Sequence, residues 1–133
     1  MIEVGNALLR MHQEHALLRD LGVGGNRVLF CLETEAVART QHFPKATLRV
    51  SISGSDTNAV VPFAATEYVK VAEGHEVELA RLARAIREAL NGKARLLDPE
   101  ASIHRLTCSG AAIEADVPGA IQVRIEWIGE ASW

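Results

Sequence analysis

The sequence predicts an α+β fold in which two helices pack on one face of a mostly antiparallel sheet. Two segments repeat apolar residues at helical spacing, and other segments alternate apolar and polar residues as strands do. Turns rich in glycine, proline and asparagine separate them. The chain has 133 residues and is 48% hydrophobic, which suits a single α+β domain over residues 1–133.

The first third of the chain predicts a helix, a strand and a loop. Apolar residues recur at helical spacing over residues 2–21, and Gly22 supplies a helix end. Residues 27–32 are almost uniformly apolar, which is typical of a strand covered on both faces, so we expect a central strand there. The polar segment 33–46 is expected to be a loop that ends near Phe43-Pro44, because proline disfavours helix in the residue before it.

The rest of the chain predicts a hairpin, a helix and a second strand pair. Residues 47–53 alternate strictly, residues 54–58 form a turn, and residues 59–72 return as the antiparallel partner. Residues 74–90 carry a helical apolar stripe that ends at Asn91-Gly92. Residues 102–108 read as a weak strand, Ser109-Gly110 and Pro118-Gly119 as turns, and residues 121–128 as a long amphipathic strand.

Charge and cysteine content exclude several classes of protein. The net charge of −3 and the pI near 5.9 provide no basic field, so nucleic acid is not expected as the main partner. Cys31 and Cys108 lack the spacing of a zinc site or a disulfide framework. We expect no secretory signal at the start of the chain and no membrane span, because no apolar run approaches the roughly 20 residues that a span needs.

The histidines are the candidates for metal binding or catalysis. His12 and His15 lie three residues apart on the expected first helix, close enough to share a metal ion. The alternative, which we favour, is that one of them is a hydrogen-bonded histidine of the core or of an interface. An enzyme would instead need two of His42, His75 and His104 to converge with a carboxylate.

Motifs for cofactors and catalysis are absent from the sequence. The glycine-rich segment 22–25 precedes a strand instead of following one, so it fails the context of a nucleotide-binding loop. A nucleophile elbow, a P-loop and a catalytic cysteine signature are also missing. We therefore expect no cofactor, no metal, no catalytic residues and no enzymatic activity.

The polar side of the expected sheet is the remaining candidate surface. It combines residues from two strands, and a subunit interface or a solvated surface would both show this mixture. The residues are Thr47, Arg49, Ser51, Ser53, Gln122, Arg124 and Glu126. Trp127 is a candidate anchor at a contact, and equally a candidate core residue. The expected contact residues are Phe43, Arg49, Arg124, Glu126 and Trp127.

Taken in order, these features resemble the tail terminator and related minor tail proteins of long-tailed bacteriophages. The resemblance rests on a first helix that ends in the segment 17–22, a strand that opens at Arg27-Val28, Phe43-Pro44 before a strand, and a helix followed by Asn91-Gly92. The closing strand around 122–125 completes the pattern. The chain departs from the family in having Lys45-Ala46 where an aromatic residue is expected, and in the extra stretch 57–63.

The resemblance implies a structural virion protein of the tail, assembled in the host cytoplasm. Copies are expected to form a cyclic homo-oligomer, a hexamer, that caps the tail tube and joins it to the head connector. Its partners are then the tail tube protein and the head connector protein, with no membrane and no sequence-specific nucleic acid. The alternatives are a head-tail joining (connector) protein, a small α+β binding adaptor that works by strand addition, and an unmarked enzyme.

Overall fold

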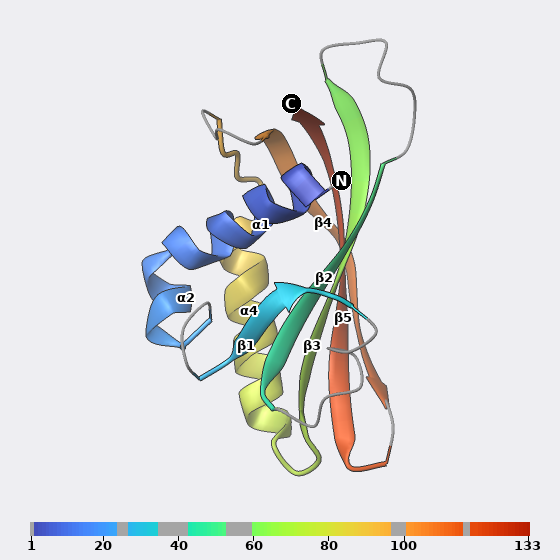
Figure 1. The fold of residues 1–133 in the computed structure, drawn as a ribbon. Coiled ribbons are helices and arrows are strands. Elements are labelled where there is room, and N and C mark those ends of the chain that lie inside the picture. Colours follow the sequence, from blue (N-terminus) through green and yellow to red (C-terminus); the bar gives the residue numbers. More distant parts are fainter. Residues whose placement is uncertain (1, 24–26, 35–42, 53–59, 97–100, 116–117) are drawn as a thin grey trace.

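The computed structural model describes residues 2–23, 27–34, 43–52, 60–96, 101–115 and 118–133 (Figure 1). These residues form a five-stranded mixed sheet and three helices, so the α+β class is confirmed. The elements are α1 (Ile2–Glu14), α2 (Ala16–Asp20), β1 (Leu29–Leu32), β2 (Lys45–Ile52), β3 (Val61–Ala72), α4 (Glu76–Leu90), β4 (Ser102–Ala115) and β5 (Ala120–Ser132).

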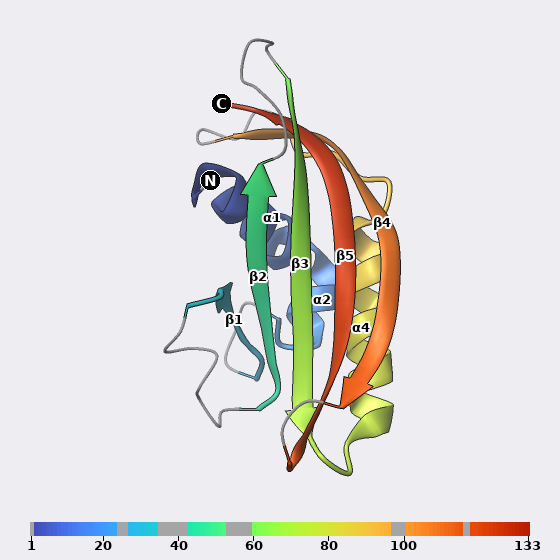
Figure 2. The same ribbon diagram turned by 90° about the vertical axis from the view of Figure 1, so that its right-hand side faces the viewer.

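The strand order is β1-β2-β3-β5-β4. β1 runs parallel to β2, and the other three neighbouring pairs are antiparallel. The predicted hairpin is confirmed, because β2 pairs with β3 from Lys45 opposite Lys70 to Ile52 opposite Phe63. The views in Figures 1 and 2 place α1, α2 and α4 on the same side of the sheet, so its other side carries no described helix.

The expected first helix is two helices. The backbone at His15 is extended, with φ −80° and ψ 120°, and it separates α1 from the short α2. Leu18 in α2 is still fully buried, on the core side like Leu8 in α1. Apolar periodicity therefore continues across the break, which is why spacing alone does not detect it.

Two strand predictions are corrected. β1 is an edge strand and not a central one, and its four residues are only half-buried. Ser109-Gly110 is not a turn but lies inside β4, where the register shifts between Cys108 and Gly110. A bulge absorbs the extra residue, so turn-forming residue types are accommodated within a long strand. The turn at Pro118-Gly119 is confirmed, with Gly119 at a positive φ of 93°.

The core lies between the helices and the inner face of the sheet. Leu79 and Ile86 of α4 and Leu8 of α1 pack there against Ile125 of β5, all less than 3% exposed. The predicted turn at 54–58 and most of the predicted loop, residues 35–42, lie outside the described residues. Among the described helices none is long and apolar enough to span a membrane.

Candidate functional site

The face of the sheet opposite the helices carries the polar residues that the sequence predicted. Strand register places Arg49, Thr66 and Glu126 in one row across β2, β3 and β5. Thr47 and Arg124 occupy the same face in the next row, with Tyr68 between them. Two separate strand patterns thus form one surface, because β3 lies between β2 and β5. Ser53 falls outside the described residues.

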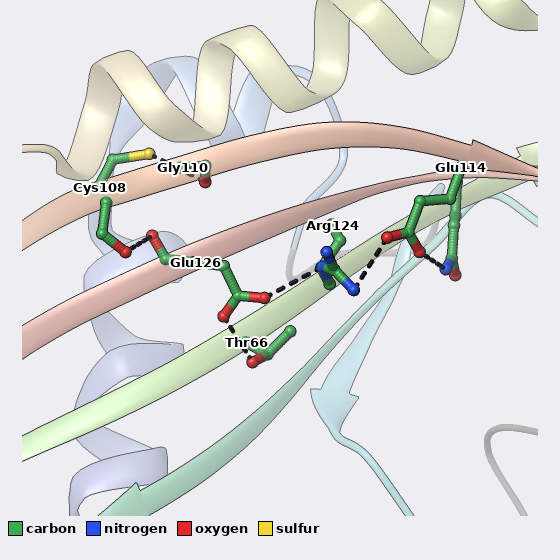
Figure 3. A network of polar contacts seen from close by, with 8 residues as sticks. Thr66, Cys108, Gly110, Glu114, Arg124 and Glu126 are labelled. Carbon is green, nitrogen blue, oxygen red and sulfur yellow. Dashed lines mark hydrogen bonds and ion pairs between the residues drawn. The ribbon is translucent and has the colours of Figure 1, made fainter.

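A network of polar contacts crosses three strands on this face (Figure 3). The Arg124 guanidinium lies 2.9 Å from a Glu114 carboxylate oxygen through Nη1, and 3.1 Å from Glu126 Oε1 through Nε. The Thr66 hydroxyl donates to Glu126 Oε2 at 2.9 Å, and the Gln122 amide donates to Glu114 Oε2 at 2.9 Å. The Arg124 guanidinium therefore pairs with two carboxylates. Each carboxylate also accepts a hydrogen bond from a neutral side chain.

A second ion pair lies toward the other edge of the same face. Arg49 Nε is 2.9 Å from Glu33 Oε2, and the Thr47 hydroxyl donates weakly to the same carboxylate at 3.4 Å. Thr47 is buried and Arg49 is exposed. Ion pairs that remain in contact with water contribute about 0–1 kcal/mol each to stability. The charged groups of this face therefore add little to folding.

The five predicted contact residues are not all on this surface. Arg49, Arg124 and Glu126 lie on it. Phe43 is half-buried two residues before β2, with its ring centroid 5.6 Å from Lys45 Nζ. Trp127 is corrected to the core: it is 1% exposed and faces the helices, because odd-numbered residues of β5 point inward. Its side chain is out of reach of any partner.

Sequence reasoning missed two groups of the network. Glu114 was missed because Ser109-Gly110 indicated a turn, so residues beyond it were not assigned to the sheet. Thr66 was not included in the predicted polar face, and its contact with Glu126 was not predicted, since sequence does not give the register between β3 and β5.

A buried polar cluster lies on the opposite, inner side of the sheet. Both Glu67 carboxylate oxygens lie 2.9–3.0 Å from His12 Nε2, and the Trp127 indole N–H donates to Glu67 Oε1 at 3.1 Å. His12 Nδ1 donates to the Leu8 carbonyl at 2.7 Å, and its ring lies 4.5 Å from that of Phe30. Because a carbonyl only accepts, Nδ1 carries a proton, and Nε2 shares a second proton with Glu67.

The burial of this cluster indicates a role in stabilising the fold and not in binding a substrate. His12, Glu67 and Trp127 are each no more than 1% exposed, so a substrate does not reach them. The hypothesis of a core histidine is confirmed for His12, whereas His15 is only half-buried. The sequence held a signal for Glu67, since it occupies an inward position in the alternation of β3 beside Val69.

The other histidines that the structure describes do not converge. His75 precedes α4, with its Nδ1 3.7 Å from Glu78, and His104 on β4 contacts the Ser132 hydroxyl at 2.8 Å. These positions lie at opposite ends of the sheet, as the pairing of β4 with β5 shows. His42 is outside the described residues. Within the described ranges no group of three or more histidine, cysteine or carboxylate side chains is arranged to hold a metal ion.

Fold and surface together define a small α+β domain with one helix-covered sheet face and one open, charge-paired face. No protein family model matches the chain, and no curated protein matches its sequence. The fold is similar to that of a chain in a solved structure described as "Virion of native gene transfer agent (GTA) particle". The TM-score is 0.69 at 14% sequence identity, over 95% of this chain and 92% of that chain. At this identity the likeness establishes the fold.

Proposed function

We propose that this protein is a structural virion component, and more specifically a ring-forming tail terminator or related minor tail protein. The observation that carries the proposal is the likeness to a virion chain, which spans nearly the whole of both chains. The likeness extends over 95% of this chain and 92% of that chain, so it is not confined to one shared motif. The sequence pattern resembles tail terminators independently of that comparison.

The geometry of the molecule favours a structural role over a catalytic one. Two fully buried titratable groups, His12 and Glu67, bond to each other, and Glu67 also bonds to Trp127 within the core. The open sheet face carries paired charges, and its described histidine, His104, contacts the Ser132 hydroxyl and no carboxylate that the structure places beside it. These features suit protein contact more than proton transfer, and we propose that the chain is not an enzyme.

In the proposed role, copies of the chain form a closed ring, a hexamer, on the head-proximal end of the tail tube. The ring stops tube polymerisation and presents a surface to the head connector. A closed ring needs one patch of each subunit to meet a different patch of its neighbour. The two edges of the open sheet, β1 and β4, provide such a pair of unlike surfaces.

The solution mass, measured by light scattering on a size-exclusion column with and without purified tail tubes, tests this proposal. We expect either a discrete hexamer, or a monomer that tube ends capture and that halts their growth. Capture by the head connector instead of the tube would favour the head-tail joining alternative. A monomer or dimer that ignores both partners would overturn the terminator proposal and favour the binding adaptor.

A further inference from the structure

The outer edge of β4 is covered over only part of its length. Near the start of β4, backbone hydrogen bonds join Ile103 to Arg95 and Leu106 to Lys93. The last of these contacts is the Cys108 N–H, which donates to the Asn91 side chain. Beyond it, the Cys108 thiol donates weakly to the Gly110 carbonyl at 3.5 Å, and the described residues provide no partner for the outer N–H and C=O groups of residues 111–115, although this stretch pairs regularly with β5 on its inner edge.

Residues 110–113 of this edge carry no charge and no proline, and the charge that follows, Glu114, is already paired with Arg124. Exposed edges usually carry charges or proline, or are bulged along their length. Here the sequence runs Gly110-Ala111-Ala112-Ile113, and Ile113 is 70% exposed. An apolar side chain on an unpaired edge favours pairing with a further strand.

A groove between β4 and α4 continues this edge. Its volume is about 250 Å³. Most of its walls are apolar side chains, Ala80, Ala83, Ala111, Ala112, Ile113 and Val123, and Arg87 completes the lining. Arg87 Nε is buried and has no hydrogen-bond partner among the described residues, whereas its neighbour Arg84 is paired with Glu88 at 2.9 Å. A buried unsatisfied donor is costly, so an incoming carbonyl oxygen is the expected acceptor.

The partner edge is more consistent with β1 than with a second β4. Two β4 strands paired about a two-fold axis would bring the Arg87 side chains of both copies together, which is unfavourable for like charges. β1 is the opposite edge of the sheet, and all four of its residues, Leu29 to Leu32, are apolar and half-buried (Figure 2). Each edge thus has apolar side chains that the other would cover.

Strand directions agree with this pairing. β1 runs parallel to β2, and three antiparallel steps then lead to β4, so β1 and β4 point in opposite directions. Rotation about a ring axis that runs along the strands preserves direction, so β1 of the next copy meets β4 antiparallel. Antiparallel ladders are slightly more stable per residue than parallel ones.

We propose that β1 of one copy adds to residues 110–115 of β4 in the next copy, so that one repeated contact extends the sheet around the ring. This inference rests on the proposed function, because it specifies the contact between neighbouring subunits of the proposed ring. Residues directly opposite each other in a sheet lie on the same face. Cys31 shares the open face with Thr47, and on β4 the residues Gly110, Ala112 and Glu114 lie on that face.

Disulfide cross-linking tests the pairing directly. In a Cys108→Ser background, Gly110→Cys, Ala112→Cys or Glu114→Cys is combined with the native Cys31 and oxidised. We expect at least one of the three to give a ladder of dimer, trimer and higher species on a non-reducing gel, and Cys31→Ser to abolish it. The matched controls are Ala111→Cys and Ile113→Cys, which face the helix side and should cross-link poorly.

A charge variant supplies a second measurement. Ile113→Lys should reduce assembly at least tenfold while leaving the monomer folded, because the side chain is mostly exposed. Val77→Lys, at a position that is 76% exposed on α4, is the matched control and should assemble normally.

Failure of the inference and failure of the proposed function give different results. A ring that forms without any ladder, or that tolerates Ile113→Lys, overturns the edge pairing and leaves the terminator role intact. A dimer that persists in Cys31→Ser also overturns it, in favour of a two-fold contact through β4. A chain that gives no ladder, no ring and no binding to tubes overturns both.

Discussion

Removal of the Glu67 side chain should be among the most destabilising single changes in this chain. Glu67→Ala deprives two buried donors, His12 Nε2 and the Trp127 indole, of their acceptor. Each orphaned buried donor costs about 1–3 kcal/mol. For two donors we therefore expect a loss of about 2–6 kcal/mol, a large part of the roughly 5–15 kcal/mol that stabilises a domain.

Urea denaturation at pH 7, followed by tryptophan fluorescence, measures this loss. The signal is suited to the question because Trp127 itself belongs to the cluster. Glu88→Ala is the matched control, since it removes an exposed carboxylate that pairs with Arg84, and it should change stability by less than about 0.5 kcal/mol.

A double-mutant cycle tests the reasoning behind the magnitude. When apolar residues replace both His12 and Glu67, only the Trp127 N–H loses its acceptor, so the double variant His12→Leu/Glu67→Leu should lose less than the sum of the single variants. Strict additivity, or a Glu67→Ala variant as stable as the unmodified protein, would refute the assignment of this cluster as a coupled buried network.

Two further predictions concern a close approach and a surface ion pair. Gly129→Val should destabilise the chain by about 1–3 kcal/mol in urea denaturation, because a Cβ at Gly129 would lie 2.7 Å from the Phe63 ring, whereas Gly110→Ala, with nothing within 4 Å, should be neutral. The hydrogen bond from Arg95 lowers the pKa of the Glu14 carboxyl below its usual value. This stabilisation is present above the unfolded pKa and is lost as pH falls through the folded pKa. Arg95→Met should therefore cost up to about 1 kcal/mol at pH 7 and nothing at pH 2, and an equal cost at both values would contradict the pair.

The patterns that depend only on neighbours along the chain were predictable. Helical spacing located α4 closely, and alternation assigned the inward and outward residues of β3 and β5, including the polar positions Arg124 and Glu126. These predictions are correct because the direction of a side chain within a helix or strand follows from backbone geometry alone.

The patterns that depend on tertiary position were not predictable. The uniformly apolar β1 fits a central strand as well as an edge strand beside a helix, and only the pairing order decided between them. β4 continues through Ser109-Gly110 with a bulge at this point, although these residue types by themselves indicate a turn.

The sequence by itself determined the α+β class, the location of the main amphipathic segments and the polar character of one strand face. Only the tertiary structure decided that His12 meets Glu67 across 55 residues of chain, and that Arg124 lies between Glu114 and Glu126. The physical reason is that spacing along the chain fixes which way a side chain points. Strand order and register fix what it meets, and those depend on how all the segments share a single core.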